Sequence, residues 1–293
     1  MIGTEMRISN VSSFPLHSIT PDVFTMKYRF LFVWLFIPIG CGLLYPFVKD
    51  NPQFLEWLTI GLGISILFFS VVIHELCHGL AAYWCGDLTA KDAGRLTLNP
   101  INHISLVGTL IVPLALYLTR SSMLFGWAKP VPFNPLNVRQ HPRDQVMIAI
   151  AGPLANFTLA YLFFNFMLVA VVIFKGIYPE TAVPATWDVF SPLAMPDIRF
   201  EAFWFVLLHV LSAGMVLNVV LGVFNLIPFP PLDGSWIVKA LLPKRAVTVF
   251  GKVQQFGFIF LIVAMHFHLL EVLFYPAILI IALFQLIAGF YSG

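Results

Sequence analysis

Long apolar runs separated by short polar breaks dominate the pattern of residues along the chain. Four of these runs are close to the length needed to cross a hydrocarbon core of roughly 30 Å. They predict membrane-spanning helices over Phe30–Val48, Leu58–Trp84, Val146–Phe174 and Phe203–Phe229. The third run is expected to break early at Gly152-Pro153, because proline lacks a backbone donor and opposes helix.

The final apolar stretch, Phe256–Phe290, is less regular, since His266, His268, Glu271 and Pro276 interrupt it. This pattern fits one crossing followed by a shallow helix, and it fits a tight pair of segments equally well. Together with the four runs, it predicts about five or six transmembrane helices.

The region between the second and third predicted spans has a different character. Ile104–Leu118 is apolar, but it is too short to cross a bilayer and contains Gly108 and Pro113. A segment of this length favours a re-entrant path rather than a crossing.

Polar stretches on either side of that segment show two further patterns. Leu96 and Leu98 alternate with polar neighbours, which predicts a short strand. Residues 126–135 read GWAKPVPFNP, and their prolines favour an extended loop. We therefore expect a re-entrant or short-strand segment near residues 95–135.

The composition supports a single membrane domain. The chain is 59% hydrophobic and 10% charged, with a mean hydropathy of +0.90, whereas soluble domains carry about 25% charged residues. We expect an all-α polytopic membrane domain over residues 30–293, with its core at about 55–245, after a cytoplasmic N-terminal tail of residues 1–29. The basic residues are scattered over loops, which argues against a nucleic acid partner.

The second predicted span ends in the sequence His74-Glu75-Leu76-Cys77-His78. Residues four apart lie on the same face of a helix, so His74 and His78 can bind one metal ion. Glu75 lies beside that face, where it can act on a water that the metal activates. Two histidines and a glutamate that satisfy one another in a polar core would give the same pattern.

A tetrahedral catalytic zinc takes three protein ligands and leaves one position for water, so a third ligand is needed. The other carboxylates in or near the apolar runs are Glu56, Asp87, Glu271 and Asp233. Glu56 and Glu271 fit span ends at the membrane interface, and Asp87 would have to fold back. Asp233 follows a proline-rich break, where an unwound helix end can turn its side chain inward. We therefore expect Asp233 to be the third ligand.

If Asp233 joins the histidines, the two spans that carry these ligands must run in the same direction. An odd number of crossings must separate them, which agrees with a non-crossing segment at residues 104–118. On this topology all but three of the 16 lysines and arginines lie on one side, the exceptions being Lys49, Lys175 and Arg199. The positive-inside rule makes that side cytoplasmic, so we expect the active site toward the cytoplasmic side of the membrane.

In combination, these motifs resemble the site-2 protease family of intramembrane zinc metalloproteases. After the His-Glu-x-x-His helix, the family's Gly-Pro-x-x-Asn, Asn-x-x-Pro and Leu-Asp-Gly motifs are matched in order by Gly152-Pro153-Leu154-Ala155-Asn156, Asn225-Leu226-Ile227-Pro228 and Leu232-Asp233-Gly234. Residues 126–135, with Asn99-Pro100 before them, look like a compact bacterial and archaeal branch without PDZ or CBS domains.

The resemblance implies a zinc-dependent endopeptidase that hydrolyses a peptide bond in a transmembrane protein or peptide, within the lipid bilayer of a prokaryotic plasma membrane. It implies one Zn²⁺ bound by His74, His78 and Asp233. Glu75 would be the catalytic base, and Asn225 would hold the substrate backbone or its oxyanion. The resemblance specifies neither the substrate sequence nor the oligomeric state.

Other polar residues in the apolar runs have simpler interpretations beside the functional ones. Asn156 and Asn225 can hydrogen-bond across helices or support catalysis, and Asn218 is expected to pack. His103 begins the re-entrant segment and could reach the site. His209, like the two histidines of the final stretch, is expected to be a satisfied interior or interfacial group.

A non-catalytic membrane metal-binding protein or a metal transporter is the alternative function. Intramembrane histidines and carboxylates also serve ion pathways, so the ligands alone do not separate the two. Glu75 separates them, because catalysis needs a base at this position and a transport site tolerates glutamine.

Overall fold

A computed structural model describes residues 28–118, 126–140, 142–178, 202–267 and 271–292. Every regular element in these residues is a helix, which confirms the all-helical class predicted from the sequence. The predicted tail and the loop around residues 179–201 lie largely outside the described residues, as do the side chains of His266 and His268.

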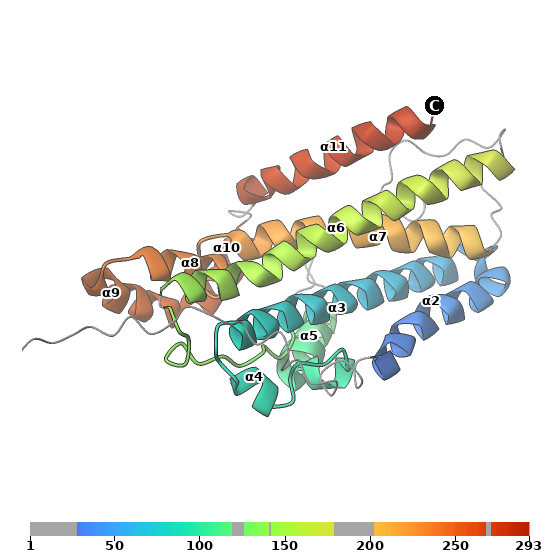
Figure 1. The fold of residues 1–293 in the computed structure, drawn as a ribbon. Coiled ribbons are helices and arrows are strands. Elements are labelled where there is room, and N and C mark those ends of the chain that lie inside the picture. Colours follow the sequence, from blue (N-terminus) through green and yellow to red (C-terminus); the bar gives the residue numbers. More distant parts are fainter. Residues whose placement is uncertain (1–27, 119–125, 141, 179–201, 268–270, 293) are drawn as a thin grey trace, which may run out of the picture.

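Three long helices form the centre of the fold (Figure 1). They are α3 (Pro52–Trp84), α6 (Arg143–Ile177) and α7 (Ala202–Leu226). α6 packs along both α7 and α3, and α3 also contacts α7. α3 and α7 run in the same direction, while α6 runs opposite to both (Figure 1). This is the direction of the two ligand-bearing spans that the sequence predicts.

Two apolar helices flank this centre. α2 (Tyr28–Val48) packs against α3 and α7, and α11 (Tyr275–Ser292) packs against α6 and α7. The final apolar stretch is divided, because α10 (Gly257–His266) is followed by the short helix η5 (Glu271–Phe274) and then by α11. The short helices α4 (Thr89–Asp92), α8 (Gly234–Leu241) and α9 (Lys244–Gln254) lie toward one end of the long helices (Figure 1).

Three helices in the described part of the chain are long and apolar enough to cross a membrane. They cover Pro52–Trp84, Arg143–Ile177 and Val206–Leu226, with hydropathies of 2.0, 2.4 and 2.2. Only 33% of the apolar window in the first two is buried inside the protein. Most of their apolar side chains therefore face outward, as lipid-facing side chains do.

Two residues set the end of α3. Gly86 has a φ of 104°, in the left-handed region that glycine adopts without steric cost. The N–H of Gly86 donates to the carbonyl oxygen of Tyr83 at 3.1 Å, and the N–H of Asp87 donates to that of Ala82 at 2.9 Å. This pair of bonds is the Schellman motif, which ends a helix by satisfying its last carbonyl groups.

α6 continues through Pro153, so the predicted break at Gly152-Pro153 is wrong. Proline is tolerated inside a transmembrane helix when neighbouring groups satisfy the backbone around it. Pro153 leaves the carbonyl of Ala149 without its helical donor, and the adjacent carbonyl oxygen of Ile148 accepts a hydrogen bond from Nδ1 of His78 at 2.7 Å.

The predicted strand at residues 95–98 is also wrong. A strand needs a neighbouring strand, and the described residues contain none. Nearby side chains bind the backbone groups of this segment instead. The carbonyl oxygen of Thr97 accepts from Nε2 of His103 at 2.9 Å, and Oγ1 of Thr97 accepts from the N–H of Asn99 at 3.1 Å. The chain then enters the 3-10 turn η2 (Pro100–His103).

The short apolar segment forms a π-helical turn, η3 (Leu106–Ile111), that leads into α5 (Val112–Leu118). It lies against residues 126–135, which we call the proline loop. A Cβ at Gly108 would come within 2.5 Å of the Trp127 indole, and the Trp127 N–H donates to the Gly108 carbonyl oxygen at 3.0 Å. Glycine is therefore required at residue 108 by close contact.

Asp87 ties the end of α3 to the proline loop. Its fully buried carboxylate accepts from the N–H of Asn134 at 2.6 Å, from the amide of Asn137 at 3.0 Å and from the N–H and hydroxyl of Thr89. Burial raises the pKa of this carboxyl, but the hydrogen bonds, led by that of Thr89, outweigh burial and hold the pKa below its ordinary value. Asp87 thus serves the structure and does not fold back toward the histidines.

Replacing Asp87 with asparagine is expected to lower the free energy of unfolding by roughly 1.5–3 kcal/mol, because an amide nitrogen would face N–H donors. Unfolding in detergent measures the loss, with the exposed Asp92→Asn as the matched control. The folded pKa is lowered, so the stabilisation is present above the ordinary value of 3.8 and disappears as the pH falls through the folded pKa. Equal stability of the two variants at neutral pH would contradict this role.

Candidate active site

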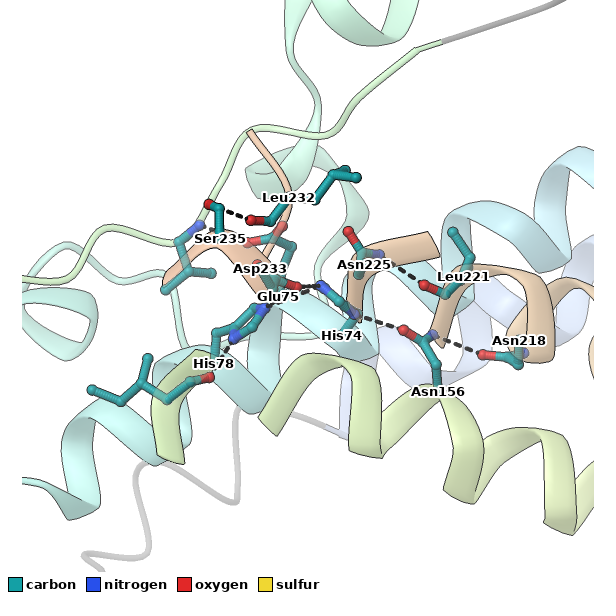
Figure 2. A network of polar contacts seen from close by, with 12 residues as sticks. His74, Glu75, His78, Asn156, Asn218, Leu221, Asn225, Leu232, Asp233 and Ser235 are labelled. Atoms are coloured by element: carbon teal, nitrogen blue, oxygen red, sulfur yellow. Dashed lines mark hydrogen bonds and ion pairs between the residues drawn. The ribbon is translucent and has the colours of Figure 1, made fainter. Parts of the chain in front are cut away.

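Two histidines in the last third of α3 point toward Asp233, which lies in the turn between α7 and α8 (Figure 2). Oδ2 of Asp233 lies 3.0 Å from Nε2 of His74 and 3.1 Å from Nε2 of His78. The two Nε2 atoms lie 3.0 Å apart. Among the described residues, these three side chains form a group that could hold a metal ion. The structure therefore brings together the three residues that the sequence predicts as ligands.

A hydrogen bond at the far side of each imidazole sets which nitrogen carries the proton. Nδ1 of His74 lies 2.6 Å from Oδ1 of Asn156, and Nδ1 of His78 lies 2.7 Å from the carbonyl oxygen of Ile148. Both partners are acceptors, so each Nδ1 donates and each Nε2 keeps its lone pair. Such partners orient metal-binding histidines and fix their tautomer.

A buried chain of polar side chains continues from His74 across three helices (Figure 2). The Asn156 amide nitrogen donates to Oδ1 of Asn218 at 2.9 Å, and the Asn218 amide nitrogen donates to Oγ of Ser70 and to the carbonyl oxygen of Gly214, both at 2.8 Å. Because each amide has fixed partners, Asn156 must turn its oxygen toward His74. The expectation that Asn218 only packs missed this role, although a polar side chain buried in an apolar helix needs a partner.

α6 approaches the histidine pair closely because residue 152 is glycine. A Cβ at Gly152 would lie 2.6 Å from Cε1 and 2.7 Å from Nε2 of His74, and closer still to Nε2 of His78. Real Cβ atoms do not approach other heavy atoms this closely. The glycine of the Gly-Pro pair is thus explained by contact with the histidines.

Glu75 lies on the neighbouring side of α3 and contacts the proline loop. Its Oε2 accepts a hydrogen bond from the backbone N–H of Val131 at 2.8 Å. This contact could not be predicted from the sequence, because a main-chain donor 56 positions away leaves no mark in the residue pattern. The carboxylate is therefore held in place by the loop.

Asn225 and two histidines complete the set of candidate residues. Asn225 lies beside His74 in Figure 2, but its amide nitrogen donates to Leu221 of its own helix at 3.0 Å. His103 is buried outside the ligand group, and burial lowers its pKa below the ordinary value. His209 is buried in α7, as expected for an interior group.

The chain matches the sequence profile of peptidase family M50 over residues 62–265. The chain belongs to this family. Relatives include YwhC of Bacillus subtilis, 34% identical over 68% of this chain and 78% of YwhC. Rip2 of Mycolicibacterium smegmatis is 25% identical over 70% of this chain and 67% of Rip2. MJ0611 of Methanocaldococcus jannaschii is 26% identical over 66% of this chain and 76% of MJ0611.

The names of all three relatives mark them as candidate zinc metalloproteases. No solved structure matches the chain. Membership of family M50 confirms the resemblance to the site-2 proteases and the predicted class of enzyme, a metalloendopeptidase. The apolar helices of the fold add that this hydrolase is a membrane protein.

Replacing Gly152 with alanine is expected to weaken the binding of a divalent metal at least about tenfold, because the new methyl group would displace both imidazole rings from their partners. Competition with a chelating dye measures the affinity. Gly176→Ala is the matched control, since it lies on the same helix and its Cβ would meet nothing within 4 Å. Wild-type affinity in Gly152→Ala would show that the close contact does not constrain the rings.

Proposed function

We propose that this M50 peptidase is a zinc-dependent intramembrane endopeptidase, which hydrolyses a peptide bond in a transmembrane segment of another protein or peptide. The observation that carries the proposal is the convergence of His74, His78 and Asp233 beside Glu75. The histidines lie on a helix long enough to cross a membrane, and Asp233 lies in the turn that follows another. A peptidase centre at this place can reach peptide bonds that lie in the bilayer.

The three ligand atoms fit zinc in chemistry and in spacing. Zinc in proteins prefers imidazole nitrogen, thiolate and carboxylate oxygen, with bonds to nitrogen of about 2.0–2.1 Å. In a tetrahedral site of that size, neighbouring ligand atoms lie about 3.3 Å apart, close to the 3.0 and 3.1 Å separations observed. The names of the relatives support the same metal. We assign one Zn²⁺ to His74, His78 and Asp233.

Zinc bound there would supply a Lewis acid that polarises the scissile carbonyl and lowers the pKa of water toward about 7. Glu75 is the general base. Its Oε2 is occupied by the Val131 N–H, so Oε1 is the oxygen that takes the proton of the attacking water and passes it to the leaving amine.

Asn225 is the proposed contact for the substrate backbone or its oxyanion. An amide nitrogen carries two protons, and the bond to Leu221 uses one of them. The second proton can bind a carbonyl oxygen or the charge that develops on it. The place of Asn225 in the last turn of α7, close to the turn that carries Asp233, supports this role.

We propose about five or six membrane segments, with α2 and the α10–α11 region added to the three long helices. Ile104–Leu118 would be re-entrant, which its short helices support. The excess of lysine and arginine places the catalytic end of the bundle toward the cytoplasm. A prokaryotic plasma membrane is the proposed location.

Glu75→Gln is expected to lower the rate of cleavage by roughly 10²–10⁴-fold, since the amide cannot act as a base. The enzyme is reconstituted in vesicles with a panel of single-span peptides, and fragments are identified by mass spectrometry. Bound zinc should stay at the wild-type level. Glu56→Gln, which alters an exposed carboxylate at the opposite end of α3, is the control and should keep both properties.

The same experiment tests the alternative of a metal transporter or metal-binding protein. Zinc uptake into the vesicles by both wild type and Glu75→Gln, without any peptide fragment, would favour the alternative. Cleavage by Glu75→Gln at the wild-type rate would exclude Glu75 as the base.

A further inference from the structure

We infer that Arg95 is a positioning residue for Glu75, acting through the peptide group between Pro130 and Val131. This inference rests on the proposed function, in which Glu75 is the base. Arg95 is not one of the proposed zinc ligands, and it has no part in the roles described above. It belongs to the segment that was expected to form a strand.

The contacts of Arg95 are made to two successive carbonyl groups of the proline loop. Its Nη2 donates to the carbonyl oxygen of Lys129 at 2.7 Å and to that of Pro130 at 3.2 Å. The next backbone donor along the chain is the N–H of Val131, which donates to Glu75 at 2.8 Å. Arg95 therefore holds the loop directly before the residue that holds Glu75.

One planar peptide group joins the two charged side chains. The carbonyl of Pro130 and the N–H of Val131 belong to the same peptide unit, and in a trans peptide they point in opposite directions. The guanidinium binds the carbonyl edge and the carboxylate binds the N–H edge. A cation at the oxygen polarises the peptide and strengthens the bond that its N–H donates, since hydrogen bonds in a chain reinforce one another.

Close packing on α3 keeps this peptide within reach of Glu75. A Cβ at Gly79 would lie 2.6 Å from Cδ2 of Leu96 and 2.9 Å from Cγ1 of Val131. Gly79 is four residues after Glu75, so it lies one turn along the same face of the helix. Both segments therefore rest on the helix next to the base.

Stability alone does not explain a cation at this position. Arg95 is 8% exposed, and its buried Nε has no hydrogen-bond partner among the described residues. Within those residues no carboxylate lies within ion-pair distance of it, although the charge of Glu75 favours its charged form. Burying a charge in this way is costly, and apolar replacements of buried charges are often neutral or stabilising. Local violations of this kind are expected at functional sites.

The functional consequence is a fixed carboxylate. With Oε2 bound to Val131, Glu75 cannot swing away from the ligand group, and Oε1 keeps one orientation toward the attacking water. Without Arg95 the proline loop can shift, and the carboxylate loses its partner. The chemical step then slows, while the contacts that bind substrate remain.

Arg95→Met tests the inference against the exposed Arg143→Met, whose guanidinium donates to Gln140 and makes no other side-chain hydrogen bond within the described residues. Hydrogen exchange of residues 126–134 is measured in the reconstituted protein, together with bound zinc and the kcat and KM for the best-cleaved peptide of the panel. In Arg95→Met the Val131 amide should exchange at least about tenfold faster. The kcat should fall roughly 10–100-fold with unchanged zinc and a KM within about threefold.

Arg95→Lys should recover part of both losses, because an ammonium can reach one of the two carbonyl groups. Arg143→Met should match wild type in every measurement. Fast exchange with a wild-type kcat would overturn the inference, and so would a wild-type exchange rate in Arg95→Met. If Arg95→Met does not fold, Arg95→Lys takes its place, and its Val131 exchange rate and its kcat should show smaller changes in the same directions.

A backbone pair gives a second, independent test. Val131→Pro removes the N–H that binds Glu75, whereas Val131→Ala keeps it. Val131→Pro should lower kcat as far as Arg95→Met does, and the double variant should be no slower than either single variant, because both act through one contact. Additive losses would overturn the inference. Cleavage by Glu75→Gln would instead remove the proposed function, while the exchange of Val131 would still report on Arg95.

Discussion

Two imidazole lone pairs and a carboxylate meet within 3.1 Å, and the rest of the structure depends on keeping this electron-rich group together. Without a cation between them the three groups repel one another, more strongly in an apolar surrounding than in water. Each of these side chains therefore needs a hydrogen-bond partner on the side away from the other two. Asn156 and the carbonyl of Ile148 are these partners for the two imidazoles, and both belong to α6. α6, which runs opposite to α3 and α7, thus orients the two histidines although neither of them belongs to it.

That requirement explains why small or unusual residues occur where the helices meet. Gly152 removes the atoms that would collide with the rings, and Pro153 follows it in a helix that nevertheless continues. Polar side chains are expensive in such a bundle unless they are paired. Asn156, Asn218 and Ser70 are linked to one another by hydrogen bonds. The same logic extends to Glu75, the proposed base, which is bound by a main-chain amide whose peptide is held by a buried guanidinium.

Much of the helical framework could be predicted from the sequence, because apolar runs of membrane length are local patterns. The meeting of His74, His78 and Asp233 was also predicted, since metal coordination restricts which distant residues can meet. The errors share a cause. Alternating leucines at residues 96 and 98 suggest a strand, but no partner strand exists among the described residues. The bond between Val131 and Glu75 uses a main-chain group, and such groups are the same at every position.

The buried amide chain also holds the three long helices together. Ser70, Asn218 and Asn156 join α3, α7 and α6 at the depth of His74, so parting these helices would expose several unpaired polar groups to lipid. The contacts of the proline loop with α8 and α10 are of another kind. They include the ring pairs Phe133–Trp236 and Trp127–Phe258, with centroids 5.4 and 4.8 Å apart. Such pairs separate at a cost of about 0.5–1.5 kcal/mol each beyond their buried area. The hydrogen-bonded contact among α3, α6 and α7 therefore costs more to open than these ring contacts between the proline loop and α8 and α10.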